Sequence, residues 1–229
     1  MSHPTPSAFA ASPPRTTATV AWPDAARHAA FDAWLAPLAA AQGLQPGTLR
    51  PASADASFRR YLRIDTGTPG QSCVVMDAPP DKENCRPFVQ VQALLQQAGL
   101  HVPQILAWDE ANGFMLLSDL GQQTVIDILD PAAPQDAYAW YQQATDTLLQ
   151  WQLASRPGVL PAYDEALLRR ELALFPDWYI AQHRGMALDA AQQAVLDHAF
   201  NRIVAHNLEA PSVFVHRDFT MRNLMVPTT

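Results

Sequence analysis

Residues 216–223 read His-Arg-Asp-Phe-Thr-Met-Arg-Asn and carry the strongest chemical signal in the chain. Asp218 and Asn223 are separated by a short loop, which lets both side chains face one site. A carboxylate can orient a hydroxyl and take its proton, and an amide oxygen is a hard ligand of the kind that Mg²⁺ accepts. The apolar run Val-Phe-Val at 213–215 predicts a strand that leads into this loop.

The sequence before Gly121 predicts a small antiparallel sheet with one or two helices. Small polar residues at 53–57 separate two strand-like runs, and the turn signal Asn112-Gly113 precedes another apolar run. Hydrophobic residues at helical spacing mark the helices. We expect strands within 49–64, 71–77, 101–109 and 114–118, and helices at 24–42 and 87–98.

Beyond Gly121 the helical period dominates. Pro176 interrupts one of the helical patterns. The expected helices are 125–129, 137–154, 164–180 and 189–206. A sheet followed by helices indicates an α+β protein of two lobes, and we expect a disordered leader at 1–20, an N-terminal lobe at 21–120 and a helical C-terminal lobe at 121–229.

Composition excludes several classes of protein. The chain has 229 residues, of which 48% are hydrophobic, enough for a sizeable core. A net charge of −7 argues against non-specific binding to nucleic acid or to an anionic membrane. No apolar run approaches the roughly 20 residues that span a bilayer, and residues 1–19 lack the apolar core of a secretory signal. Cys73 and Cys85 have no metal-spaced neighbours, so we expect reduced thiols in a cytoplasmic protein, without a disulfide or zinc site.

The spacing within 216–223 fits the H-R-D-x-x-x-x-N catalytic loop of protein kinases. That pattern also arises by chance, but here it follows a sheet and then helices, as it does in kinases. With the segments around it, the chain resembles the aminoglycoside phosphotransferase superfamily, and within it the bacterial kinases that phosphorylate the anomeric hydroxyl of N-acetylmuramic acid and N-acetylglucosamine. The matching segments are 55–61 (D-A-S-F-R-R-Y), 76–80 (M-D-A-P-P), 85–88 (C-R-P-F), 116–121, 171–179 (E-L-A-L-F-P-D-W-Y) and 216–225.

The resemblance implies a two-lobed, protein-kinase-like fold that uses ATP and Mg²⁺ and acts on a small sugar. It makes Asp218 the catalytic base, Asn223 a metal ligand and His216 a scaffold residue. It makes the N-terminal lobe the nucleotide-binding one. The implied nucleotide-binding residues are Ser57 and Phe58 in the turn over the phosphates and Ser118, Asp119 and Leu120 in the hinge beside adenine; the implied sugar contacts are Glu171, Asp177, Trp178 and Arg222.

Each of these assignments has a plainer alternative. Alternatively, the turn at 56–58 is an ordinary hairpin, and Trp178 and Tyr179 are core residues. Arg59, Arg60 and Arg63 we interpret as solvated strand positions, the alternative being that they steer anionic ligands.

Two departures from the kinase pattern stand out. Protein kinases keep a lysine on the third strand that contacts the ATP phosphates. The strand at 73–77 has none, and Lys82 and Arg86 are the nearby candidates. In addition, the second metal-binding aspartate of the family would follow the catalytic loop, but the sequence ends at Thr229. We therefore expect a truncated chain that binds Mg·ATP poorly and turns over little or not at all.

Three other functions stay open on the sequence alone. In the first, the chain is a kinase whose acceptor is an aminoglycoside or a choline-like molecule. In the second, it is a catalytically inactive kinase-fold binding protein. In the third, it is an unrelated α+β domain with a chance motif. A sugar substrate, a monomeric state, and no nucleic-acid or membrane partner are the expectations we carry forward.

Overall fold

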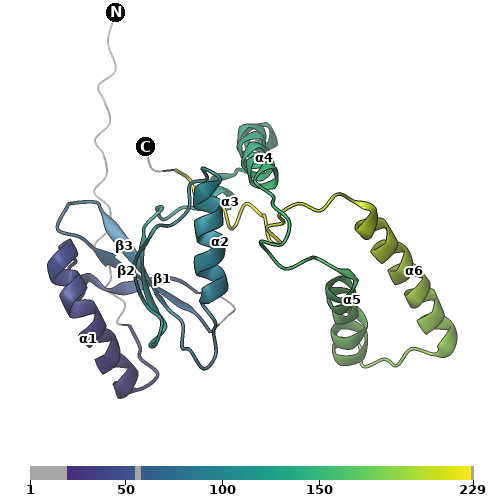
Figure 1. Ribbon diagram of the computed structural model, residues 1–229, viewed down its shortest axis with the longest axis horizontal. Helices are drawn as coiled ribbons and strands as arrows, with labels where there is room; N and C mark the ends of the chain where they lie inside the picture. The colour runs from purple at the N-terminus through teal and green to yellow at the C-terminus, as the bar shows by residue number, and fades with distance from the viewer. Residues whose placement is uncertain (1–19, 55–57, 228–229) are drawn as a thin grey trace, which may run out of the picture. The chain divides into compact units, whose positions relative to one another are not determined.

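The computed structural model describes residues 20–54 and 58–227 (Figure 1). The chain divides into two compact units: residues up to Ile128 together with Met225 onward, and Leu129–Leu224. The first unit contains a five-stranded antiparallel sheet, and the second contains helices and the loop at 216–223. The predicted α+β class is confirmed.

The sheet has the strand order β1-β2-β3-β5-β4. Its strands are β1 (Arg50–Ala54), β2 (Arg60–Asp65), β3 (Ser72–Asp77), β4 (Ile105–Asp109) and β5 (Phe114–Ser118). The strand predicted at 114–118 is confirmed with both ends. The one predicted from 101 begins only at Ile105, because Pro103 has no N–H to donate to a ladder.

One face of the sheet packs against α1 (Ala25–Gln42). The Asp24 side chain accepts a hydrogen bond from the Arg27 backbone N–H at 2.7 Å, and Gly43 ends the helix in the left-handed conformation with φ 64°. Phe31 and Leu35 of the helix pack on Leu62, Ile64, Val75, Phe114 and Leu116 of the sheet. The predicted helix at 24–42 is confirmed, and it runs on through Pro37.

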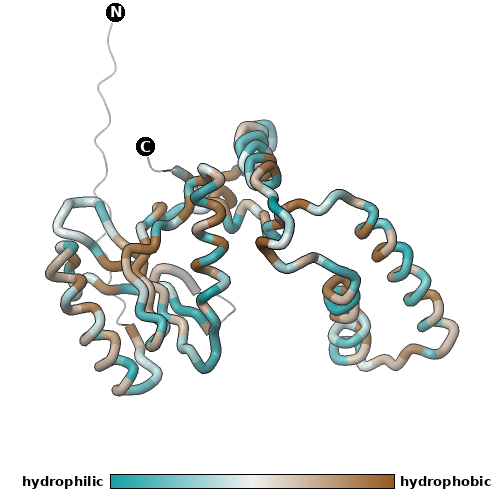
Figure 2. The backbone as a smooth tube through the Cα atoms, viewed as in Figure 1, coloured by the Kyte–Doolittle hydropathy of each residue, from teal (hydrophilic) through white to brown (hydrophobic). Residues whose placement is uncertain are grey.

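The opposite face packs against α2 (Arg86–Gln97), and Figure 1 shows α1 and α2 on the two sides of the sheet. We call this side the α2 face. Met76, Met115 and Leu117 form its core, with Phe88 and Val89 of the helix packed against them. The strands between the two helices carry hydrophobic colour in Figure 2, as expected for a sheet that is covered on both sides.

Asp77, at the end of β3, joins α1 to the sheet. Its side chain is 1% exposed and accepts hydrogen bonds from the guanidinium groups of Arg27 in α1 and Arg60 in β2. The Nε atoms of both arginines lie 3.0 Å from its carboxylate oxygens. Arg27 and Arg60 also lie over the rings of Phe114 and Trp22, so the ion pairs are embedded in aromatic packing.

Gly113 permits the tight turn between β4 and β5. Its φ is 70°, and a Cβ there would stand 1.9 Å from the carbonyl oxygen of Ala78. The Ala78 N–H in turn donates to the Gly113 carbonyl at 2.9 Å. Only glycine combines this conformation with so close an approach of the two backbones.

The second unit is built around helices that begin with side-chain caps. Asp164 caps α5, and Asp189 and Gln192 form a capping box on α6. Arg169 of α5 donates to Asn201 of α6 at 2.9 Å. The elements are η2 (Pro134–Asp136), α4 (Ala137–Leu153), α5 (Glu165–Leu174), the π-helix η3 (Phe175–His183) and α6 (Ala190–Glu209); η1 (Pro46–Thr48) and α3 (Val125–Ile128) belong to the first unit.

The strand predicted at 213–215 is wrong. The Phe214 N–H donates to the Ser155 hydroxyl at 2.7 Å instead of to a neighbouring strand, and its ring packs 4.7 Å from that of Trp151. Among the helices of the described residues, none is both long and apolar enough to cross a membrane.

We predict that Asp77→Ala lowers the free energy of unfolding by about 3–5 kcal/mol, because it leaves two half-buried arginines without their shared carboxylate. The matched control is Glu110→Ala, whose exposed pair with Arg86 should contribute at most about 1 kcal/mol. Urea unfolding of both variants measures the difference. Equal and small losses would contradict the role of Asp77 in holding α1.

Candidate active site

The loop at 216–223 brings Asp218 and Asn223 into contact. The Asn223 side-chain N–H₂ donates to the Asp218 carboxylate at 2.7 Å and to the Asp218 backbone oxygen at 2.9 Å. Two backbone bonds, from Thr220 N–H to Asp218 and from Asn223 N–H to Thr220, tighten the loop between them. The two side chains that the sequence placed at one site therefore meet there, and both are exposed.

The residue before Asp218 has the one non-glycine left-handed backbone in the described part of the chain. Arg217 has φ 72°, a conformation that is strained for a side chain with Cβ. Its guanidinium donates to the Glu171 carboxylate of α5 at 2.9 Å and lies 5.8 Å from the centre of the Tyr163 ring. Sequence reasoning missed this contact, since no local pattern links positions 171 and 217.

His216 contacts Phe219 rather than Asp218. The two rings meet edge to face at 5.3 Å, which fits the scaffold role expected for this histidine. Below them, buried Phe214 holds the start of the loop against Trp151 of α4. The position of the loop thus depends on packing and on two side-chain hydrogen bonds, those of Ser155 and Glu171.

The predicted sugar contacts lie on α5, η3 and the loop. Asp177 and Trp178 fall in η3, and π-helices are frequent at functional sites. Trp178 is 66% exposed and Tyr179 48%, so the alternative that they are core residues does not hold for this unit. Glu171 of α5 is bonded to the loop through Arg217. In the described part of the chain, Asp177, Trp178 and Arg222 form no hydrogen bond or ion pair with Asp218 or Asn223.

The predicted hinge residues close the end of β5. The Ser118 hydroxyl accepts from the Gln104 N–H at 2.8 Å, and the Ser118 N–H donates to the Gln104 carbonyl. The Asp119 carboxylate is 7% exposed and accepts from Arg63, from the Ser72 hydroxyl and from the Gly121 N–H. Its side chain is therefore committed to the fold. Leu120 is partly buried.

The pKa of Asp119 is lowered. Burial alone would raise the pKa of this carboxyl, but the hydrogen bonds from Arg63, Ser72 and Gly121 outweigh burial. The carboxylate is consequently held in its charged form.

Arg59, which directly precedes β2, and Arg60 and Arg63 within it are all ion-paired. Arg59 pairs with Glu83, Arg60 with Asp77 and Arg63 with Asp119, and each arginine is no more than a third exposed. Our interpretation of them as solvated strand positions is therefore wrong: alternation along the strand sends them to both faces, where carboxylates of other segments receive them. Phe58 is 65% exposed, and its N–H donates to Glu83 at 3.2 Å. Ser57 lies outside the described residues.

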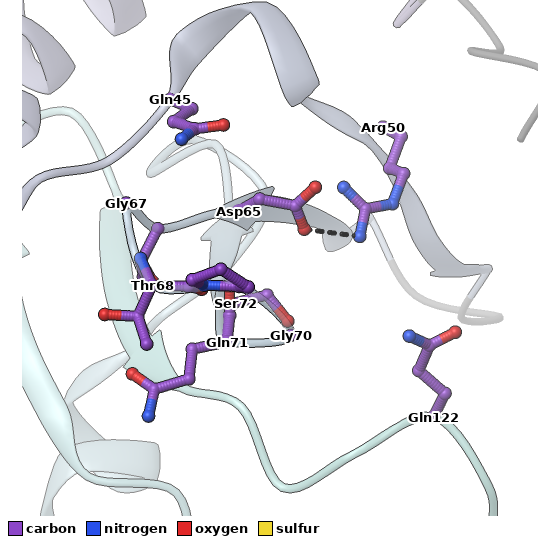
Figure 3. A pocket seen from close by; sticks show the side chains of 11 residues that line it. Gln45, Arg50, Asp65, Gly67, Thr68, Gly70, Gln71, Ser72 and Gln122 are labelled. Carbon is purple, nitrogen blue, oxygen red and sulfur yellow. Dashed lines mark hydrogen bonds and ion pairs between the residues drawn. The ribbon is translucent and has the colours of Figure 1, made fainter.

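A polar pocket of about 210 Å³ opens beside the β2–β3 turn (Figure 3). Its one cation, Arg50, donates to Asp65 at 2.7 Å and to the Thr48 carbonyl at 3.0 Å. Pockets for cofactor-sized ligands are usually about 300–1,000 Å³. This pocket is smaller, and its arginine is engaged in structural bonds.

The donors at the loop fit a magnesium ion that is shared with phosphate groups. Mg²⁺ is commonly held by one or two protein oxygens and completes its shell with water and phosphate oxygens. The Asn223 amide supplies such an oxygen. In the described part of the chain, no three His, Cys, Asp or Glu side chains gather as a self-sufficient metal site.

We predict that Asp119→Asn lowers the free energy of unfolding by about 3 kcal/mol at pH 7, because Arg63 loses its buried partner. A depressed pKa stabilises the fold above the unfolded-state value of about 3.9. This stabilisation is lost as the pH falls through the folded-state pKa. Urea unfolding at pH 7 and near pH 3 should show that the difference in unfolding free energy between parent and variant shrinks on acidification. The exposed control, Asp32→Asn, should have nearly the parent's unfolding free energy at both pH values. A difference that is the same at both pH values would contradict the charged state assigned to Asp119.

Comparison with known proteins adds three relatives that share one name, N-acetylmuramate/N-acetylglucosamine kinase. The relative from Pseudomonas aeruginosa is 52% identical over 199 residues, which are 86% of this chain and 57% of the relative. The relative from Pseudomonas putida is 46% identical, and the match covers 80% of this chain and 52% of that protein. The relative from Neisseria meningitidis is 41% identical over 76% of this chain and 52% of its own length. The chain thus spans a little over half the length of the curated relatives it matches.

The family described as "Phosphotransferase enzyme family" matches residues 48–229. That match takes in the whole sheet, the hinge, η3 and the loop at 216–223. On a match of this extent, the chain belongs to the phosphotransferase enzyme family.

Proposed function

We propose that this chain is the greater part of an ATP-dependent kinase for a small amino sugar, acting on the anomeric hydroxyl of N-acetylmuramic acid or N-acetylglucosamine. The observation that carries the proposal is the contact of Asp218 with Asn223 inside the H-R-D loop. The names of the relatives supply the sugar, and the family supplies the reaction class. A monomeric, cytoplasmic enzyme that recycles cell-wall sugars fits this proposal.

In the proposed reaction, the sugar hydroxyl oxygen attacks the γ-phosphorus of ATP. A new P–O bond forms to the sugar, the bond to the β,γ-bridging oxygen breaks, and ADP leaves. Asp218 accepts the hydroxyl proton as the oxygen attacks and releases it to solvent afterwards. Arg217, fixed by Glu171, sets the backbone from which the Asp218 carboxylate projects.

Asn223 would hold Mg²⁺ through its side-chain oxygen. The ion, when bound, neutralises charge that develops on the phosphate oxygens. Asn223 has a second role that its present bonds support: by donating to Asp218, it fixes the direction of the carboxylate.

An exposed indole beside carboxylates suits a sugar. The apolar face of a pyranose stacks on an aromatic ring, while carboxylates accept hydrogen bonds from its hydroxyls. In this proposal Trp178 supplies the ring and Asp177 and Glu171 the acceptors. Arg222, exposed on the loop, would donate to the sugar or to its carboxylate.

For the nucleotide, we propose that the backbone at 118–120 binds adenine and that Ser57 with the Phe58 N–H faces the phosphates. The bonds of Ser118 and Asp119 support this by making the hinge rigid.

The test uses two proteins, because the chain spans 57% of the Pseudomonas aeruginosa relative. One is the 229-residue chain, and the other is a chimera in which the chain replaces the matched part of that relative. ADP formation is measured with N-acetylmuramic acid, N-acetylglucosamine, an aminoglycoside and choline. We expect sugar-dependent ADP formation by the chimera, and little by the chain alone. Turnover only with the aminoglycoside or choline would overturn the acceptor, and binding without any turnover would favour a binding protein.

We predict that Asp218→Asn in the chimera lowers kcat by about 10²–10⁴-fold, because the acceptor hydroxyl loses its base. The affinity for ATP should change little. Asp146→Asn, an exposed aspartate on α4, is the matched control. Near-normal turnover in the Asp218 variant would disprove its role as base.

A further inference from the structure

The third strand of the sheet has no cation to offer to phosphate groups. The residues of β3, Ser72–Asp77, include neither lysine nor arginine. Met76 lies on the α2 face, and Asp77 on the opposite face is taken up by Arg27 and Arg60. A phosphate-binding cation for the first unit therefore has to come from another segment.

Arg59 directly precedes β2 and lies on the α2 side of the sheet, because it interacts electrostatically with Cys85, a buried residue of the α2-face core. Tyr61 and Arg63 of β2 face the same side. Tyr61 pairs with Met76 in the β2–β3 ladder, and side chains two residues apart on a strand share a face. An electrostatic contact between Arg59 and Tyr61 agrees with this placement. Arg63, further along β2, is bonded to Asp119 of the hinge.

The stretch from Arg59 to Arg63 has the length that an extended nucleotide needs. Strand residues rise about 3.3 Å each, so Arg60 and Arg63 are separated by roughly 10 Å along β2, and Arg59 stands one residue before Arg60. Adenine at the hinge and phosphates at the opposite end of the strand span a comparable distance. Arg59 is thus the cation at the end where the proposed function puts the phosphates.

Glu83 holds Arg59 in place. Its Oε2 accepts from the Arg59 Nε at 3.1 Å, while its Oε1 accepts from the Phe58 N–H at 3.2 Å. The backbone N–H groups of Lys82 and Glu83 both donate to the Pro79 carbonyl, which fixes the turn that carries Glu83. The Arg59 side chain is 24% exposed and that of Glu83 14%. The ion pair is therefore half-buried.

The other nearby cations are placed differently. Lys82 is 53% exposed and pairs only loosely, at 3.5 Å, with its neighbour Asp81. Arg86 is 75% exposed and pairs with Glu110. Arg60 is on the α1 face, bonded to buried Asp77. Neither Lys82 nor Arg86 has the backing of a half-buried carboxylate.

Resting on the proposed function, we infer that Arg59 is the cation that binds the ATP phosphates in this chain and that Glu83 is its positioning residue. The pair takes the place of a lysine on the third strand and its partner carboxylate. Guanidinium suits this task, since its fork of N–H donors can hold Glu83 through Nε and present the outer N–H groups to phosphate oxygens.

The test compares ATP with adenosine, because only ATP carries phosphates. Isothermal titration of the chimera described above measures both affinities, with Mg²⁺ present. We expect Arg59→Ala to weaken ATP binding about 10- to 100-fold, the effect of one charge-assisted bond to a phosphate, and to leave adenosine binding within about twofold. Arg59→Lys should fall between parent and alanine. Arg169→Ala, which removes a surface arginine of α5, is the charge-matched control.

Glu83→Gln separates positioning from charge. If only charge mattered, removing a carboxylate near phosphates would strengthen ATP binding. We expect weaker ATP binding, by about threefold to tenfold, with adenosine unaffected, since Arg59 loses its anchor. Stronger ATP binding would overturn the positioning role.

Three results would overturn the assignment of Arg59. The first is an equal loss of ATP and adenosine binding in Arg59→Ala, which would mark a merely structural arginine. The second is a loss of ATP binding in Lys82→Ala or Arg86→Ala with none in Arg59→Ala. The third is a parent chimera that binds neither ligand, which would overturn the proposed nucleotide site itself and the inference with it. Circular dichroism and thermal unfolding confirm that each variant is folded.

Discussion

The buried carboxylate of Asp77 is the constraint on which the first unit depends. A carboxylate that is 1% exposed is stable only when it is paired, and here it takes one arginine from α1 and one from β2. This arrangement fixes which side of the sheet is covered by α1. It thereby assigns the alternate residues of β2 and β3 to the α2 face, where Tyr61 and Met76 lie. Arg59, the cation that we propose for the ATP phosphates, is on the same side of the sheet.

The second unit shows a different way to hold a site. Its loop has no ladder to fix it, and it depends on a few long-range contacts: Phe214 on Trp151, the Phe214 N–H on Ser155, and Arg217 on Glu171. The backbone of Arg217 adopts a strained, left-handed conformation in this arrangement. An ion pair to α5 stabilises a conformation that glycine would adopt freely, and the side chain that follows is Asp218. Strain of this kind is common where a catalytic group must point in one direction.

Much of the fold could be predicted because local signals agree with it. The N-cap Asp24 and the C-cap Gly43 bracket α1, and the apolar run that follows Asn112-Gly113 became β5 with both its ends. The predicted strand at 213–215 failed because three apolar residues do not specify whether they pair with a strand or pack under a helix. The predicted helix at 164–180 became α5 followed by a π-helix. Pro176 predicts an interruption of the α-helix, but no local pattern predicts that the chain continues as a π-helix.

The functional residues of the loop could be predicted from sequence, whereas the ion-pair partners that hold the loop and the arginines in place could not. Asp218 and Asn223 were found from the spacing of the motif, since only four residues of loop separate them. The partners of the arginines were not, because Arg59 meets Glu83 and Arg217 meets Glu171 across 24 and 46 positions of sequence. Alternation along a strand tells which face a residue occupies but not which carboxylate another segment brings there. The roles of Asp218, Asn223 and the sugar contacts stand as proposals that rest on this geometry.

The most direct test of the account is ³¹P NMR of the product that the chimera forms from ATP and N-acetylglucosamine. Transfer to the anomeric oxygen predicts a new phosphate signal split into a doublet by the single proton at C1 of the sugar. A triplet, from the two protons at C6, would contradict the proposed acceptor hydroxyl. Inorganic phosphate alone, with no sugar phosphate, would contradict the account of this chain as part of a sugar kinase.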